Sequence, residues 1–157
     1  MKSNITWDQY FMGVAKLSSL RSKDPNTKVG ACIVNSDNRI VGVGYNGLPF
    51  GCDDDEFPWT RQGDNEAETK YPYVVHAELN AILNSIQSLK GCRLYVSLFP
   101  CNECAKAIIQ SGISEIVYAD DKYIGTPGNI ASKRMLDSAK IKYRVMTDVD
   151  VTLQNVK

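Results

Sequence analysis

Four residues in two short motifs have the chemistry of a metal site with a carboxylate beside it. His76 and Glu78 stand in His-Ala-Glu, and Cys101 and Cys104 stand in Pro-Cys-Asn-Glu-Cys. Zinc binds thiolates and imidazoles, and three protein ligands leave its fourth tetrahedral position to water, as in catalytic sites. Because zinc lowers the pKa of that water to about 7, a nearby carboxylate such as Glu78 can take up and deliver its proton. The motifs therefore predict a zinc site that activates water.

Each motif alone has simpler interpretations. A lone Cys-x-x-Cys is also typical of a core pair or a redox dithiol, and a His or Glu at a helix start often serves only the helix terminus. A closed structural zinc site also stays open, with one further cysteine as the fourth ligand: Cys32, Cys52 or Cys92. Such a site would leave Glu78 without a role. Because Cys32 and Cys92 lie in apolar segments, we expect them to be buried as small hydrophobic residues.

The elements that must position these motifs alternate between strands and helices. Periodicity and turn residues predict helices at 7–21, 76–86, 105–110 and 130–139, and strands at 29–35, 39–45, 92–98, 115–119 and 142–146. A capping box at Thr6 and Gln9 starts the first helix, and Gly112 ends the third. The first two strands form a hairpin, and right-handed crossovers make the later strands parallel. We therefore predict an α/β fold with three α/β/α layers around a mixed five-stranded sheet.

In this arrangement both motifs lie at helix N-termini. His76 opens the second helix, and Cys101 lies where the third strand gives way to the third helix. Two crossover helices that enter from the same edge of the sheet would bring these N-termini together. A helix N-terminus also stabilises thiolates, so we expect the three metal donors to converge there.

Length and composition limit the alternatives. The 157 residues carry 18 Lys plus Arg and 18 Asp plus Glu, which gives a net charge of zero and no basic excess for a nucleic acid polymer. No apolar run approaches the roughly 20 residues of a membrane span, and residues 1–7 show no basic region followed by an apolar stretch, so we expect no signal sequence. Five cysteines favour reduced thiols over a disulfide framework. We expect a cytoplasmic protein with one domain at 1–157, in which the aperiodic stretch of about 46–73 is a functional loop.

Longer motifs carry a family resemblance. His-x-Glu with Pro-Cys-x-x-Cys is the pattern of zinc-dependent deaminases, and the chain resembles the deoxycytidylate (dCMP) deaminases of the cytidine deaminase-like superfamily in 24–31, 42–52, 76–82 and 98–106. The resemblance covers nearly the whole chain. It implies a cytidine deaminase-like fold, a Zn²⁺ cofactor, and hydrolysis of dCMP to dUMP and ammonia, which supplies dUMP for thymidylate synthesis. It implies His76, Cys101 and Cys104 as zinc ligands and Glu78 as the catalytic proton shuttle.

The resemblance also implies substrate contacts. Asn46 resembles an asparagine that hydrogen-bonds the nucleoside, and Ala77 and Tyr123 are expected to line the substrate pocket. Arg21 and Lys28 are candidates for the phosphate, which needs cations or N–H donors. Simpler interpretations stay open here: Asn46 precedes Gly47 in a common turn dipeptide, Tyr123 suits a surface loop, and the two cations suit solvated positions.

Regulation and assembly enter through the resemblance alone. It implies an effector site for dCTP as activator and dTTP as inhibitor in the long loop, at Gly47, Leu48, Pro49, Gly51, Cys52 and Asp53. Mg²⁺ can accompany a bound triphosphate on carboxylates, although the acidic run at 53–56 is also typical of a solvated surface. The resemblance further implies a homo-oligomer, a hexamer. The chain's single histidine is already used at 76, so a second, histidine-bound zinc is not expected.

Three rival functions stay open. Another zinc deaminase could act on adenosine in tRNA, on guanine or on a riboflavin precursor, although zero net charge disfavours tRNA and the long loop disfavours free bases. A non-catalytic zinc module and a dithiol redox protein are the other two classes. Metal content and oxidation state separate the zinc module from the dithiol protein.

Overall fold

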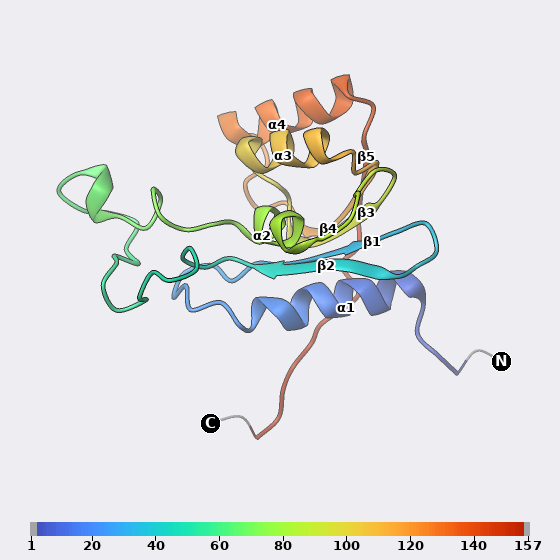
Figure 1. Cartoon of the computed structure of the whole chain (residues 1–157), viewed down its shortest axis with the longest axis horizontal. Helices are drawn as coiled ribbons and strands as arrows, with labels where there is room; N and C mark the ends of the chain where they lie inside the picture. The colour runs from blue at the N-terminus through green and yellow to red at the C-terminus, as the bar shows by residue number, and fades with distance from the viewer. Residues whose placement is uncertain (1–2, 156–157) are drawn as a thin grey trace.

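A computed structural model describes residues 3–155 and has a central sheet between two helical layers (Figure 1). The strands are β1 (Gly30–Val34), β2 (Ile40–Tyr45), β3 (Arg93–Leu98), β4 (Glu115–Asp120) and β5 (Lys142–Val145). The helices are α1 (Trp7–Ser19), α2 (Ala77–Asn84), α3 (Asn102–Ser111) and α4 (Pro127–Ser138), with a short 3-10 helix η1 (Glu66–Glu68). Helix α1 covers one face of the sheet and α2, α3 and α4 cover the other. The predicted three-layer fold is confirmed.

The sheet is mixed, with the order β2-β1-β3-β4-β5. Strand β1 pairs antiparallel with both β2 and β3, and β4 pairs parallel with β3 and β5. The predicted hairpin and the predicted parallel half are therefore both present. Helix α2 leads into the start of β3, and α3 follows the end of β3. The N-termini of α2 and α3 can therefore meet at the carboxyl end of β3.

Local signals account for most helix ends. The Thr6 hydroxyl accepts a hydrogen bond from the Gln9 N–H, and the Gln9 side chain accepts one from the Thr6 N–H, which completes the predicted capping box. Gly112 ends α3 in the left-handed region at φ 87°, as predicted. Helix α4 begins at Pro127 rather than at 130, because Thr126 caps it and proline suits the first helical position.

Two hydrophobic clusters hold the layers together. The cluster under α1 includes Phe11, Met12 and Tyr95, and the opposite cluster includes Ile33 and Leu94, all fully buried. Cys32 and Cys92 lie one in each cluster, which confirms them as buried small residues. Burial raises the pKa of Cys32 to about 12, so this thiol stays protonated at neutral pH.

The long loop leaves the sheet edge beyond β2 and extends to one side of the molecule (Figure 1). It contains η1 and ends at a bridge in which Gly47 and Val75 exchange hydrogen bonds of 3.1 and 2.8 Å.

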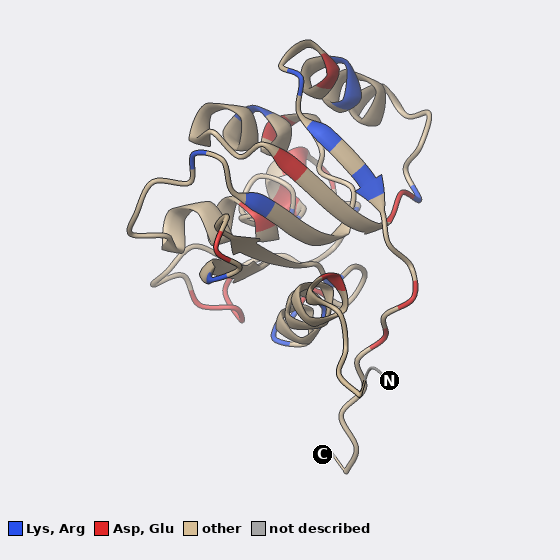
Figure 2. Ribbon diagram, turned by 90° about the vertical axis from the view of Figure 1, so that its right-hand side faces the viewer, with Lys and Arg blue, Asp and Glu red and all other residues tan. Residues whose placement is uncertain are grey.

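Within residues 3–155, no helix has both the length and the apolar character needed to cross a membrane. Acidic and basic residues are interspersed over the side shown in Figure 2.

Candidate active site

The three predicted metal ligands converge from two helix N-termini. His76 is the N-cap of α2, Cys101 is the N-cap of α3, and Cys104 lies in the first turn of α3. His76 Nδ1 is 3.4 Å from the sulfur of Cys101 and 3.4 Å from that of Cys104. The ligand atoms of all three residues lie within 4.8 Å of one another. One imidazole and two sulfurs therefore face a common point.

This donor set fits zinc. With Zn–N of about 2.0 Å and Zn–S of about 2.3 Å, tetrahedral geometry puts the nitrogen about 3.5 Å from each sulfur, close to the separations in the structure. In the described part of the chain, this group contains no fourth ligand residue. The closed site with a third cysteine is therefore not supported, and Cys32 and Cys92 lie in the core instead. Three ligands leave one position for water.

Electrostatics favours a thiolate next to a positive charge. The hydrogen bond from the Cys104 thiol lowers the pKa of Cys101 to about 4, against the opposing effect of burial and with the help of His76. The hydrogen bond to Cys101 raises the pKa of His76. The site thus favours a thiolate on Cys101, whereas the hydrogen bond to Cys101 and burial raise the pKa of Cys104. Binding of a metal cation requires both sulfurs as thiolates, so it would displace the proton of Cys104.

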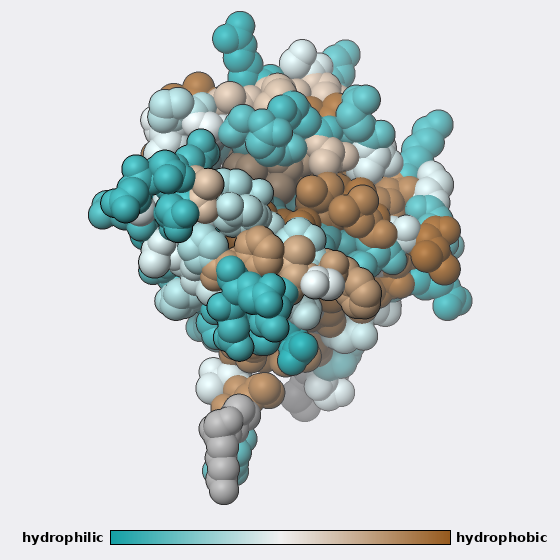
Figure 3. All heavy atoms as spheres, turned by 60° about the vertical axis from the view of Figure 1, so that its left-hand side comes forward, coloured by the Kyte–Doolittle hydropathy of each residue, from teal (hydrophilic) through white to brown (hydrophobic). Residues whose placement is uncertain are grey.

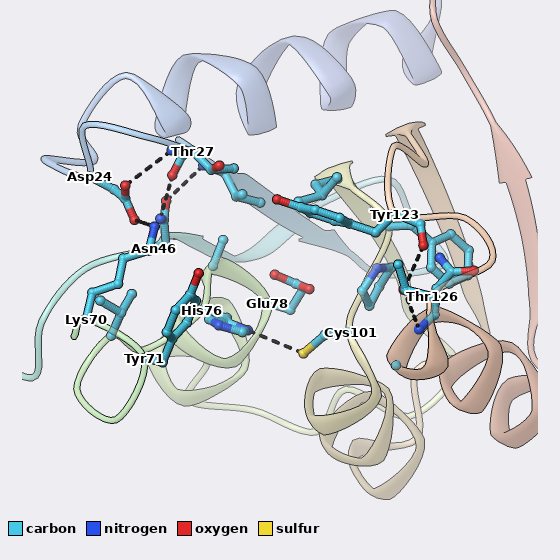
Figure 4. A pocket seen from close by; sticks show the side chains of 18 of the residues that line it. Asp24, Thr27, Asn46, Lys70, Tyr71, His76, Glu78, Cys101, Tyr123 and Thr126 are labelled. Carbon is cyan, nitrogen blue, oxygen red and sulfur yellow. Dashed lines mark hydrogen bonds and ion pairs between the residues drawn. The ribbon is translucent and has the colours of Figure 1, made fainter. Parts of the chain in front are cut away.

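Glu78 lies in the first turn of α2, two residues after His76, and its exposed fraction is only 4%. Burial raises the pKa of Glu78 to about 7, while the neighbouring His76 acts to lower it. A carboxyl group whose pKa lies near the working pH is suited to accept and donate protons. Its side chain faces the same space as His76 and Cys101 (Figure 4).

That space is a cavity of about 370 Å³, large enough for a small-molecule ligand. Figure 4 shows Asn46, Lys70 and their neighbours on one side, Tyr123 and Thr126 on the opposite side, and Glu78 between them. Val29, Leu98, Phe99 and other apolar residues line the remainder. The cavity therefore combines apolar wall surface with polar and charged side chains beside His76 and Cys101.

Asn46 holds one wall in place. Its Oδ1 accepts a hydrogen bond of 2.8 Å from the Val29 N–H, and its Nδ2 donates one of 2.9 Å to the Thr27 carbonyl. The amide carries two donors and two lone pairs on oxygen, so one donor and one lone pair remain available in the cavity. Asn46 thus fixes the connection between α1 and β1 and can still contact a ligand.

A buried ion pair supports the same wall. Lys70 Nζ lies 2.5 Å from Asp24 Oδ2, and the two side chains are 9% and 2% exposed. Burial acts to raise the pKa of Asp24, but the hydrogen bonds from Lys70, Asn26 N and Thr27 N outweigh it, and the pKa lies below its usual range. The pair joins the long loop to the segment that precedes β1.

The opposite wall comes from the connection between β4 and α4. Tyr123 lines the cavity, and the Thr126 hydroxyl donates a hydrogen bond of 2.7 Å to its carbonyl. Asp121 accepts a hydrogen bond of 2.7 Å from Asn129 and lies 2.6 Å from Lys133 Nζ, which ties the end of β4 to α4. Tyr123 is 44% exposed. Figure 3, which brings the side of the long loop forward, shows hydrophobic residues gathered in a patch beside hydrophilic ones.

The structure places the predicted residues unevenly. Asn46, Ala77 and Tyr123 line the cavity together with Glu78 and two of the metal donors. Arg21 and Lys28 are not among the lining residues; the Arg21 guanidinium lies over the Tyr45 ring, 5.8 Å from its centroid. The residues proposed for an effector also lie outside this cavity: Gly47, Leu48, Pro49, Gly51, Cys52 and Asp53.

Sequence reasoning missed seven polar lining residues: Asp24, Thr27, Arg61, Lys70, Tyr71, Thr126 and Asn129. Three of them belong to the long loop, where no periodicity marks one face as buried. Their only sequence signal is membership of a loop too long to be a simple connection.

Comparisons with known proteins agree with this site. A family model described as the cytidine and deoxycytidylate deaminase zinc-binding region matches residues 5–120. The deoxycytidylate deaminase of Pongo abelii is 57% identical over 141 residues, which cover 89% of this chain and 79% of that protein. The probable deoxycytidylate deaminase of Drosophila melanogaster is 58% identical over 149 residues, with coverages of 91% and 73%. The crystal structure of dCMP deaminase from the cyanophage S-TIM5, in complex with dCMP and dUMP, aligns with a TM-score of 0.71 at 28% identity and covers 93% of this chain and 99% of that one.

Proposed function

This chain belongs to the cytidine and deoxycytidylate deaminase family, and we propose that it converts dCMP and water to dUMP and ammonia with a bound zinc ion. The observation that carries the proposal is the assembly of His76, Cys101 and Cys104 beside the buried Glu78 in one cavity. The relatives named for deoxycytidylate and the phage enzyme crystallised with dCMP and dUMP support this choice of substrate.

The proposed chemistry divides between the metal and the chain. Zinc held by His76, Cys101 and Cys104 would supply a water of lowered pKa. Glu78 would accept one proton of that water and deliver it to a ring nitrogen of cytosine. It would then take the second proton from the oxygen now bonded to the ring carbon and give it to the departing amine. A carboxyl pKa of about 7 makes both directions of transfer accessible at neutral pH. The water oxygen ends on the ring carbon, and ammonia leaves.

Substrate contacts follow from the two walls. The remaining donor and lone pair of Asn46 would hydrogen-bond the nucleoside from one side, and the Tyr123 ring would contact it from the other. Ala77 is fully buried and lines the cavity, so its small side chain would let the backbone of α2 lie close to the ligand. These contacts would hold the base against Glu78.

We further propose that dCTP and dTTP regulate this activity, with Mg²⁺ on the triphosphate. The effector site would comprise Gly47, Leu48, Pro49, Gly51, Cys52 and Asp53. Its support is the two-way hydrogen-bonded bridge between Gly47 and Val75, because Val75 directly precedes His76. A ligand that moves this segment would act on the start of α2. We also propose a homohexamer, which light scattering after size-exclusion chromatography would test.

The experiment that tests the substrate compares dCMP, CMP, deoxycytidine, dCTP and guanine by the loss of ultraviolet absorbance in zinc-loaded protein. We expect dCMP to have the highest kcat/KM. Faster turnover of guanine, or no turnover of dCMP, would contradict the proposal. The same assay with added dCTP or dTTP tests regulation, and identical rates with and without these nucleotides would remove that part while leaving the chemistry intact.

A further inference from the structure

Among the charged residues that line the cavity, one cation has no acidic partner within residues 3–155. Asp24 and Lys70 neutralise each other in the buried pair, and Glu78 belongs to the metal site with His76 and Cys101. The cation that remains on the wall is Arg61, which takes part in none of the ion pairs of the described chain. An anionic group of a ligand would therefore find its electrostatic complement there.

Arg61 also keeps most of its hydrogen-bonding capacity. Its Nη2 donates one bond of 3.1 Å to the Thr27 hydroxyl, whereas a guanidinium carries five N–H donors in a planar fork. This fork matches two oxygens of a phosphate at once. Since the Arg61 side chain is exposed, it can turn towards a ligand without breaking a buried network.

The position of Arg61 relative to the nucleoside contact is fixed through one residue. Thr27 accepts the Arg61 hydrogen bond on its hydroxyl and accepts the Asn46 hydrogen bond on its carbonyl. Arg61 and Asn46 are therefore linked through a single residue on the same wall. A ligand whose nucleoside is held by Asn46 would carry its 5′ substituent within reach of this guanidinium.

The other cation of the wall is a poorer candidate. Lys70 Nζ is held by Asp24, and Asp24 also accepts hydrogen bonds of 2.8 and 3.2 Å from the N–H groups of Asn26 and Thr27. A phosphate that approached Lys70 would therefore meet a fixed carboxylate of the same sign. This pair supports the wall, and Arg61 is left to bind the anion.

We infer that Arg61 recognises the 5′-phosphate of the substrate and so makes the cavity selective for a nucleoside monophosphate over a nucleoside. The inference rests on the proposed deamination of dCMP and adds the residue that selects the phosphate. It replaces Arg21 and Lys28, which do not line the cavity, as the phosphate contact.

The test compares Arg61→Gln and Arg61→Lys with Arg39→Gln as a matched control. Arg39 is exposed in the turn between β1 and β2, outside the cavity, so its replacement removes the same charge from the whole chain. A lost charged hydrogen bond lowers kcat/KM by about ten- to hundredfold. We expect that loss for dCMP in Arg61→Gln, mainly through KM, an intermediate loss in Arg61→Lys, and no more than about a twofold change in Arg39→Gln.

Two further measurements complete the test: the turnover of deoxycytidine at high concentration, and the inhibition of dCMP turnover by dUMP. We expect Arg61→Gln to weaken inhibition by dUMP and to lower kcat/KM for dCMP much more than any turnover of deoxycytidine, which carries no phosphate. Values for dCMP within twofold of those of Arg39→Gln, or an equal loss for dCMP and deoxycytidine, would overturn the inference. A wild-type protein inactive on dCMP would instead overturn the proposed function, so the two failures are distinct.

Discussion

Replacing Gly44 by alanine tests how closely the helix that carries His76 and Glu78 must approach the sheet. A Cβ at Gly44 of β2 would lie 2.4 Å from the Ala81 nitrogen and 2.6 Å from the Ala77 carbonyl oxygen of α2. Because both obstacles are backbone atoms, α2 must retreat by about 1 Å to restore ordinary contact distances. Overpacking typically costs about 1–3 kcal/mol, and we expect the upper end here. For a domain of this size, that lowers the thermal midpoint by about 6–12 °C.

The assay is thermal unfolding with both proteins in the same excess of zinc, because ligand concentration shifts the midpoint. Gly13→Ala is the matched control. Its new Cβ would lie 4.0 Å from the Val149 and Val151 side chains, and alanine removes the helix cost of glycine in α1, so stability should rise by up to about 1 kcal/mol. A Gly44→Ala midpoint within 2 °C of wild type, or equal destabilisation by both substitutions, would refute the packing argument.

Three further predictions concern the site and its supports. Cys101→Ser should lose stoichiometric zinc in elemental analysis, because one of three ligands is removed; retention of full metal and activity would exclude Cys101 as a ligand. Lys70→Met should lower the free energy of unfolding in urea by about 3–5 kcal/mol, because it leaves the buried Asp24 carboxylate without its cation, and a loss below 1 kcal/mol would show that the pair is dispensable. The hydrogen bonds from Arg144 hold the pKa of Asp8 below its usual value, so this pairing stabilises the fold above about pH 4 and is lost as the pH falls. The difference in unfolding free energy between wild type and Asp8→Asn should therefore shrink between about pH 6 and pH 3, and a pH-independent difference would contradict that assignment.

Sequence patterns predicted the parts of this fold that depend on local chemistry. The Thr6 capping box and the Gly112 stop have local physical causes, and the alternation of strands and helices implied the parallel half of the sheet. Helix α4 begins three residues before the predicted start at 130, because Thr126 caps it and Pro127 suits the first helical position.

The convergence of His76, Cys101 and Cys104 was predictable because the chemistry of zinc restricts its candidate ligands to few residue types. The cavity wall was not, because its placement depends on contacts between distant segments. Asp24 and Lys70 are 46 residues apart, and neither lies in a sequence motif that predicts an ion pair. Arg21 and Lys28 were candidates for the phosphate because they are cations on or just after the first helix, whereas Arg61, the wall cation outside the ion pairs, comes from the loop without periodicity.

The most direct test of the account is zinc content and dCMP turnover measured on one preparation of Glu78→Gln. The three donors are untouched by this substitution, so the protein should hold one zinc per chain, as we expect for wild type. The amide cannot accept the proton of the water, so turnover should fall by at least about a hundredfold. Near-normal turnover with zinc bound would contradict the role of Glu78, and loss of zinc would contradict a site held by His76, Cys101 and Cys104 alone.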